Sequence, residues 1–242
     1  MGAVPGGCIL SVTVAGHEPG REPDGWFDVE PLRGAGRRVV VRDVDRPVVV
    51  LGSTQRASVV DARRATQRSA RAVRRRSGGG AVLLEPGAQV WVDLWVPRAD
   101  PLWTDEPRHA AVIAGRWWAD ALGRVVPGLT VHDQGSVPSP GSDLVCFAGV
   151  GPGEVLAGGR KLVGLAQWRS RQGTLVQGCA YRRWAPEGLV ELLSIGEEEG
   201  AALCEALAGA AVGLGELGAG EWTAQGLLDV LPAGPPWDVV RA

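Results

Sequence analysis

The sequence predicts an α+β fold in which a mostly antiparallel or mixed central sheet is flanked by helices. Short apolar and β-branched runs of strand length recur along the chain, and glycine-rich turns separate several of them. Few segments have the composition of a helix, so the strands do not alternate with helices as they do in a βαβ series. An apolar content of 45% is sufficient for a globular core.

The expected elements of the N-terminal part are mainly strands. Residues 1–36 are rich in glycine and proline and offer one candidate edge strand at 9–14. Valine runs at 39–41 and 48–51 predict two strands, because β-branched side chains favour a pleated sheet. Residues 58–71 have the composition of a helix, and we expect its arginines to face solvent.

A strand and a long helix are expected next. Residues 89–96 alternate apolar with other side chains, which predicts a half-buried strand. Trp91 and Trp95 lie on its second face, where they either pack in the core, the favoured interpretation, or line a pocket for an apolar ligand. Acidic residues at the start of the segment 104–122 suit the positive end of a helix, so a helix is predicted there.

The C-terminal part predicts a hairpin, a further strand and short helices. Residues 154–157 and 162–168 form the expected hairpin around Gly158-Gly159, and residues 174–180 form the next strand. Helices are expected at 186–194, 197–212 and 222–230, before a proline-rich tail at 232–242. We expect one domain over residues 1–242, without a separate C-terminal accessory domain.

Composition excludes several classes of protein. A net charge of −2 predicts no general affinity for nucleic acid or anionic membranes. No run approaches the roughly 18 uncharged apolar residues of a membrane span, and no secretory signal is visible at the N-terminus. The four cysteines (Cys8, Cys146, Cys179 and Cys204) lack CxxC spacing, which argues against a metal site or a disulfide framework. We expect a reduced, cytoplasmic protein.

Lys161 is the single lysine among 25 basic residues. It follows Gly158-Gly159-Arg160 and begins an apolar run, so it is expected at the start of a buried strand. An ammonium is a compact donor on a flexible stem, whereas a guanidinium is a wide planar fork. Lys161 is therefore either a chance lysine at a turn or a site where arginine cannot serve. A charge entering an apolar strand requires a partner.

An arginine run leads into three glycines at residues 74–80, followed by an apolar strand. Glycines allow close approach to the backbone, and freed N–H groups can hold a phosphate or carboxylate beside arginine side chains. A flexible hairpin turn explains the same pattern. The segment lacks the GK[ST] ending of a P-loop and the spacing of a Rossmann fingerprint.

Two segments together resemble the lipoate-protein ligase A and cysteine-dependent octanoyltransferase family, which is related to biotin-protein ligases. Residues 74–82 (RRRSGGGAV) resemble its RRxSGGGAV motif, and residues 159–167 (GRKLVGLAQ) resemble its GrKivGsAQ strand. The similarity extends over roughly residues 45–210. It implies a biotin/lipoate protein ligase-like fold and an enzyme that attaches an octanoyl or lipoyl group to a protein lysine.

The resemblance also implies roles for individual residues. Lys161 would stabilise the developing negative charge on the acyl carbonyl. The glycine loop and the lysine strand would bind the activated acyl group. The residues assigned to substrate binding in this way are Arg75, Arg76, Ser77, Gly78, Gly79, Gly80, Ala81, Val82, Gly164 and Ala166.

Cys146 decides between two reactions. Cys146-Phe147, a Gly/Pro loop and Glu154 before the lysine strand resemble the transferases, in which the cysteine carries the acyl group as a thioester. Most free cysteines are instead buried apolar residues. The transferase requires no cofactor, whereas the ligase alternative requires ATP, Mg²⁺ and lipoate. After the expected sheet only short helices and a tail are predicted, without the ligase's extra C-terminal domain, and this favours a transferase. The three glycines favour a ligase.

Some positions depart from the family pattern. Leu84-Glu85 replace a His-Asp pair, Leu165 replaces a serine, and Gln177 lies where a histidine-containing turn is usual. These changes leave a third alternative, a binding protein that has lost the reaction. The three histidines match no family position and are expected to be structural or exposed. The implied partners are lipoyl domains of 2-oxoacid dehydrogenases or the glycine-cleavage H-type protein, with acyl carrier protein as a candidate donor.

Overall fold

The computed structural model describes residues 12–14, 36–232 and 237–241. Its strands are β1 (Val12–Val14), β2 (Arg37–Arg42), β3 (Val48–Leu51), β4 (Arg71–Arg74), β5 (Val82–Leu84), β6 (Gln89–Pro97), β7 (Leu129–Val131), β8 (Val155–Ala157), β9 (Arg160–Arg169), β10 (Gly173–Tyr181) and β11 (Trp237–Arg241). Its α-helices are α1 (Ala62–Gln67), α2 (Pro107–Leu122), α3 (Glu187–Val190), α4 (Glu197–Ala208) and α5 (Ala224–Leu228).

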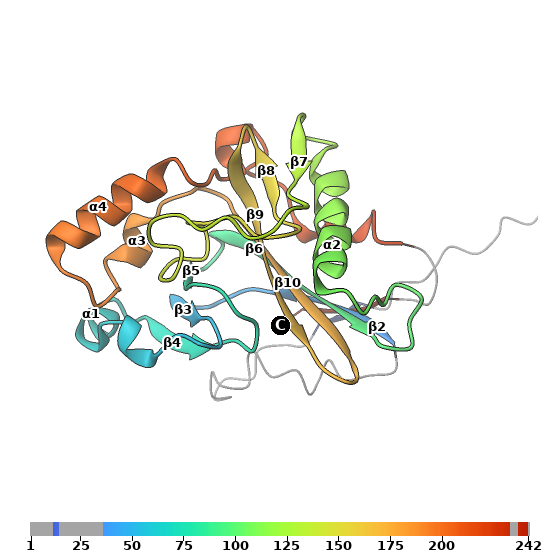
Figure 1. The fold of residues 1–242 in the computed structure, drawn as a ribbon, viewed down its shortest axis with the longest axis horizontal. Helices are drawn as coiled ribbons and strands as arrows, with labels where there is room; N and C mark the ends of the chain where they lie inside the picture. The colour runs from blue at the N-terminus through green and yellow to red at the C-terminus, as the bar shows by residue number, and fades with distance from the viewer. Residues whose placement is uncertain (1–11, 15–35, 233–236, 242) are drawn as a thin grey trace, which may run out of the picture.

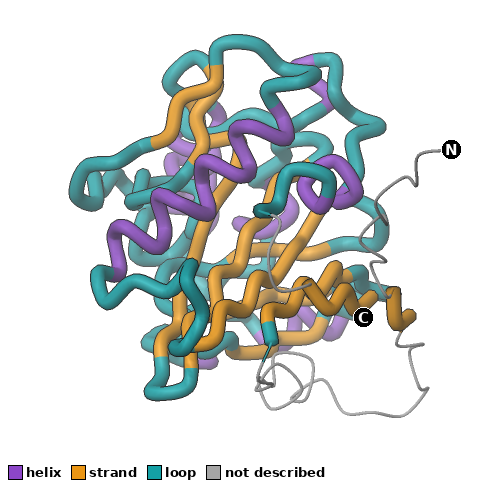
Figure 2. Tube along the Cα trace, turned by 90° about the vertical axis from the view of Figure 1, so that its right-hand side faces the viewer, coloured by secondary structure: helices purple, strands orange, loops and turns teal. Residues whose placement is uncertain are grey.

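The main sheet contains eight strands in the order β1-β11-β2-β6-β10-β9-β8-β7 (Figure 1). The two pairings of β11 are parallel, and the pairings from β2 to β7 are antiparallel. Helix α2 crosses one face of this sheet, as Figure 2 shows from the side. The predicted α+β class with a mixed sheet and flanking helices is thus confirmed.

Strand β6 is buried on both faces, so the prediction of a half-buried strand was wrong. The side chains of Val92 and Leu94 belong to the core beneath α2. On the other face, Trp91 packs against the smaller sheet. Trp95 packs with Val40 and Leu175. Both tryptophans are therefore core residues, which was the favoured of the two interpretations. A second layer, the small sheet, therefore covers the part of this face that carries Trp91.

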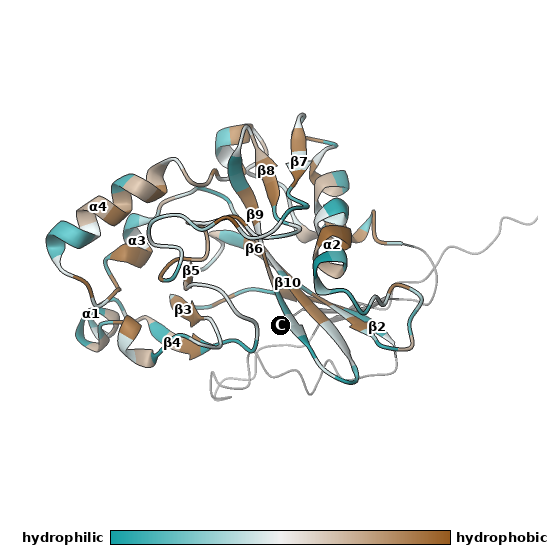
Figure 3. Ribbon diagram, viewed as in Figure 1, coloured by the Kyte–Doolittle hydropathy of each residue, from teal (hydrophilic) through white to brown (hydrophobic). Residues whose placement is uncertain are grey.

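That second layer is a three-stranded sheet in the order β4-β3-β5. Strand β3 pairs in parallel with β4 and antiparallel with β5. All residues of β3 and β5 are buried, whereas β4 exposes three of its four residues. Figure 3 shows the contrast, with an apolar β3 beside a partly hydrophilic β4.

Helix α1 is shorter than the predicted helix at 58–71. The Asp61 side chain accepts hydrogen bonds from the backbone of Arg63 and Arg64 and so caps a helix that begins at residue 62. Ser69 has a φ of 52°, which ends the helix because this left-handed conformation cannot continue it. Arg71 then begins β4, since its backbone N–H donates to Pro47.

Other boundaries also differ from the predictions. The helices expected at 186–194, 197–212 and 222–230 are present as the shorter α3, α4 and α5. The tail at 232–242 contains strand β11, which sequence reasoning missed. Of the candidate strand at 9–14, residues 12–14 form β1, and residues 9–11 lie outside the described residues.

The predicted hairpin at residues 154–168 is confirmed as β8 and β9. Gly158 and Gly159 have φ values of 56° and 79°, as a two-residue turn between antiparallel strands requires. Lys161 is the second residue of β9. No helix in the described part of the chain is long and apolar enough to cross a membrane.

Candidate functional site

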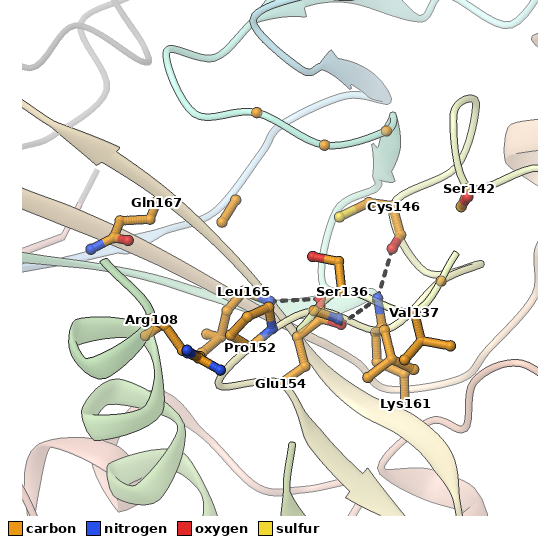
Figure 4. A pocket seen from close by; sticks show the side chains of 18 of the residues that line it. Arg108, Ser136, Val137, Ser142, Cys146, Pro152, Glu154, Lys161, Leu165 and Gln167 are labelled. Carbon is orange, nitrogen blue, oxygen red and sulfur yellow. Dashed lines mark hydrogen bonds and ion pairs between the residues drawn. The ribbon is translucent and has the colours of Figure 1, made fainter. Parts of the chain in front are cut away.

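A cavity of about 580 Å³ lies between the glycine loop, strand β9, the N-terminal end of α2 and the loops at residues 136–154. Figure 4 shows this cavity from close by. Six of the residues predicted from sequence line it: Gly78, Gly79, Gly80, Cys146, Lys161 and Ala166. The fold therefore brings the glycine motif, the cysteine and the lysine strand to one place.

Lys161 is 1% exposed and has two partners at the cavity wall. Its Nζ atom lies 2.7 Å from Oε2 of Glu154 and donates to the backbone oxygen of Cys146 at 2.7 Å (Figure 4). The Phe147 ring lies beneath it, with its centroid 5.3 Å from Nζ. The charge that enters the apolar strand is thus paired, as expected, and one of its three N–H donors remains for a ligand.

Glu154 is the acidic partner and is 3% exposed. Besides Lys161, its carboxylate accepts hydrogen bonds from the backbone of Gly151 at 2.7 Å and of Leu165 at 3.2 Å. Burial raises the pKa of this carboxyl group, and the ammonium and the two amides oppose the rise. Glu154 therefore joins the loop at residues 149–153 to strand β9 and fixes the lysine.

The Cys146 thiol lies at the cavity wall beside the glycine loop. Its Sγ atom is 3.9 Å from Nη2 of Arg75, and a methyl group added at Gly79 would lie 3.6 Å from it. Cys179 is buried, and burial raises the pKa of its thiol strongly. Cys204 lines no part of this cavity, and Cys8 lies outside the described residues. Cys146 is thus the candidate nucleophile on geometric grounds.

The glycine loop is held from inside by Arg75, which is 2% exposed. Its guanidinium donates to the backbone oxygens of Gly78 at 2.7 Å and Gly80 at 3.0 Å. Gly79 has a φ of 96°, which favours glycine. Arg75 was expected to bind substrate directly, but the structure places it within the loop, where it organises the backbone.

A buried polar chain lies beneath the loop. The Ser77 hydroxyl donates to Gln177 at 2.6 Å, and the Gln177 amide donates to Asp93 at 3.1 Å. Asp93 also accepts from Trp91 at 2.6 Å and from Arg42 at 2.6 Å. Ser77 is 0% exposed, and its hydroxyl faces Gln177 in this series of hydrogen bonds. The structure therefore does not bring it to the cavity.

The remaining predicted residues lie around the cavity and not in it. Arg76 is exposed and stacks over the Trp168 ring at 5.4 Å. Ala81 and Val82 are buried in the core below the loop. Gly164 faces the Phe147 ring, where an added methyl group would come within 2.9 Å. Gly164 therefore allows Phe147 to pack beneath Lys161.

The other end of the cavity is lined by Arg108 of α2 and Gln167 of β9, away from Cys146 (Figure 4). No group of three or more metal-ligating side chains occurs among the described residues. His109 is exposed and His132 contacts the Gly135 carbonyl, so neither of these described histidines lines the cavity.

Sequence reasoning assigned no role to Glu154 or Asp93. The signal for Asp93 was present, since it is the one acidic residue within the apolar run of residues 90–96. Glu154 precedes the hairpin that carries Lys161, and a buried lysine requires a nearby acid. Gln177, which departs from the family pattern, has a clear role as the partner of both Ser77 and Asp93.

Comparison with protein families gives one match. Residues 33–203 match the family described as Lipoyl protein ligase A/B catalytic domain. A search of curated proteins gives no match.

Solved structures with a similar fold share little sequence. A bi-partite lipoate protein ligase from Thermoplasma acidophilum, described with its E2 lipoyl domain, is 16% identical, with a TM-score of 0.56 over 80% of this chain and 68% of that one. A lipoate-protein ligase A bound with ATP is 14% identical, with a TM-score of 0.58 over 82% and 70%. P. falciparum LipL1 in complex with lipoate is 11% identical, with a TM-score of 0.54 over 84% and 53%.

Proposed function

The chain belongs to the lipoyl protein ligase A/B catalytic domain family, and on that premise we propose that it transfers an octanoyl or lipoyl group to a lysine of a lipoyl domain through a thioester on Cys146. The observation that carries this proposal is the meeting of three groups at one cavity wall. The Cys146 thiol, the Lys161 ammonium and the glycine loop all line the same space.

In the first step, the Cys146 thiolate attacks the carbonyl carbon of an acyl thioester such as octanoyl-acyl carrier protein. A sulfur–carbon bond forms, the bond to the donor sulfur breaks, and the donor leaves as a thiolate that takes up a proton. The Arg75 guanidinium donates a hydrogen bond to the attacking sulfur, with Nη2 3.9 Å from Sγ. The free N–H of Lys161 would stabilise the oxyanion of the tetrahedral intermediate.

In the second step, the neutral amine of the acceptor lysine attacks the Cys146 thioester. An amide bond forms, the Cys146 thiolate leaves, and the amine loses a proton. Glu154 holds Lys161 in the same place for both steps, because its carboxylate is itself fixed by two backbone amides.

Intact-protein mass spectrometry tests the proposal. The purified protein is mixed with octanoyl-acyl carrier protein in the absence of ATP. We expect an octanoyl adduct that hydroxylamine removes and that Cys146→Ser abolishes. Cys204→Ser, which changes a thiol away from the cavity, is the matched control and should load normally. Absence of an adduct on the unmodified protein contradicts the thioester mechanism.

ATP-dependent ligation is the second candidate, and the glycine loop supports it. A methyl group at Gly80 would lie 2.5 Å from the Val145 backbone, so the loop requires the third glycine, the feature that favours a ligase. The loop and Arg108 would then hold the phosphates of an acyl-adenylate, with Mg²⁺ bound to the nucleotide. Lipoyl transfer that requires lipoate, ATP and Mg²⁺ and persists in Cys146→Ser would establish this reaction. Failure of both reactions would favour a binding protein without catalysis.

A further inference from the structure

Six exposed arginines lie in the segment of residues 56–76, which contains α1 and β4 and leads into the glycine loop. We define this basic surface as Arg56, Arg63, Arg68, Arg71, Arg74 and Arg76. Residues 56–76 contain eight arginines and one aspartate, a net charge of +7 within a chain of net charge −2. The rest of the chain therefore carries −9, so the positive charge is concentrated in the segment that leads into the glycine loop.

The topology places this charge next to the cavity. Strands β3 and β4 are parallel, so their C-terminal ends lie side by side, and the segments that follow them begin at the same end of the small sheet. The backbone N–H of Ser53 donates to the oxygen of Ser77 at 2.9 Å, and a methyl group at Gly52 would clash with Gly79. The turn that carries Arg56 and the end of β4 that carries Arg74 therefore both adjoin the glycine loop.

Several of these arginines form no ion pair with the described part of the chain. Arg56, Arg71 and Arg74 have no acidic partner within 4.0 Å among the described residues. Arg68 differs, because it pairs with Glu85 and Glu191. Arginines on the edge strand β4 also discourage pairing with another chain. That role does not account for Arg56, which lies outside the strand.

We propose that the basic surface docks the acyl-acceptor protein and that this acceptor is acidic around its target lysine. The proposal rests on the proposed function, in which the acceptor amine must reach the cavity beside the glycine loop. Complementary charges at the rim of an interface increase the association rate and guide the orientation. Acids of the acceptor would pair with Arg56 and Arg74 while its lysine enters the cavity.

The test is a charge reversal, Arg56→Glu with Arg74→Glu. The matched control is Arg116→Glu with Arg124→Glu, two exposed arginines on and just after α2 that change the net charge equally. The acceptor is a lipoyl domain with acidic side chains around its lysine. At ~50 mM salt we expect the KM for the acceptor to be about 10-fold higher or more in Arg56→Glu/Arg74→Glu than in the unmodified protein. At ~0.5 M salt this difference in KM should shrink, because salt screens the charges.

Acyl loading of Cys146 is measured separately and should be unchanged in both variants. A normal acceptor KM in Arg56→Glu/Arg74→Glu, or an equal rise in the control, would overturn the proposal. If no acyl transfer occurs at all, the lipoyl domain is labelled with a fluorophore and its affinity for the same variants is measured. Weaker binding to Arg56→Glu/Arg74→Glu than to the control supports the docking surface independently of catalysis. Salt-dependent binding of an RNA oligonucleotide in place of the lipoyl domain would likewise overturn it.

Discussion

Replacement of Lys161 by methionine should convert Glu154 into a buried acid without a cationic partner. The two side chains are 1% and 3% exposed, and their charged atoms are 2.7 Å apart. At that distance and an effective dielectric constant of about 20, their attraction is about 6 kcal/mol. Desolvation of the two ions offsets most of it, yet removal of one partner from such a pair typically costs about 3–5 kcal/mol.

The pH dependence makes this prediction specific. Burial raises the pKa of Glu154, and in Lys161→Met the opposing ammonium is gone. The folded variant then binds a proton more tightly than the unfolded chain, so its stability is retained at low pH and lost as pH rises. We expect the free energy of unfolding to fall between pH 5 and pH 8, with a slope of at most about 1.4 kcal/mol per pH unit.

Urea unfolding followed by tryptophan fluorescence measures both quantities. The double variant Lys161→Met/Glu154→Gln removes the titrating group and should lose the extra pH dependence. Acyl loading should fall by about 10²–10³ in Lys161→Met, as for the loss of an oxyanion donor. If Lys161→Met unfolds with the same pH dependence as the unmodified protein, the argument that Glu154 and Lys161 stabilise each other in the folded state is refuted.

Three further predictions concern the loop and its surroundings. Gly80→Ala places a methyl group 2.5 Å from the Val145 backbone and should destabilise the fold by about 1–3 kcal/mol, whereas Gly78→Ala meets nothing within 4 Å and should be nearly neutral in urea unfolding. Gln177→Leu leaves the buried Ser77 hydroxyl without its partner and should cost about 1–3 kcal/mol; an unchanged unfolding midpoint would contradict the role of this buried chain. Iodoacetamide at pH 8 should alkylate Cys146 well before Cys179, whose pKa is raised by burial, and peptide mass spectrometry would contradict this if both thiols react at the same rate.

Much of the fold could be predicted because its signals are local. The valine runs of β2 and β3, the alternation in β6 and the paired glycines before Lys161 each act within a few residues. Strand pairing depends on distant segments. The sequence of β11 therefore gave no sign of its parallel position beside β2. The tryptophans of β6 indicated a covered face, but not that a second sheet covers it.

Half of the predicted site residues line the cavity, and their arrangement could not be predicted from sequence. Two motifs and Cys146 indicated these residues because they resemble the lipoate ligase and octanoyltransferase pattern. The role of Arg75 depends on the path of the loop, because its guanidinium reaches carbonyls three and five residues ahead. Ser77 turns inward because Gln177 lies across from Asp93 in the paired strands β10 and β6, a register that sequence does not reveal.

Strand β11 has a consequence for fragments of this protein. Val239 pairs with Val12 on one side and with Val39 on the other. Strand β11 therefore joins β1 to β2, and the large sheet is continuous only when these segments, far apart in sequence, meet. Contacts of such high sequence separation slow folding. A recombinant fragment that ends before residue 237 would leave one edge of β2 open, and an open edge is a template for self-association. Screening of shortened versions for crystallisation should therefore keep both terminal strands.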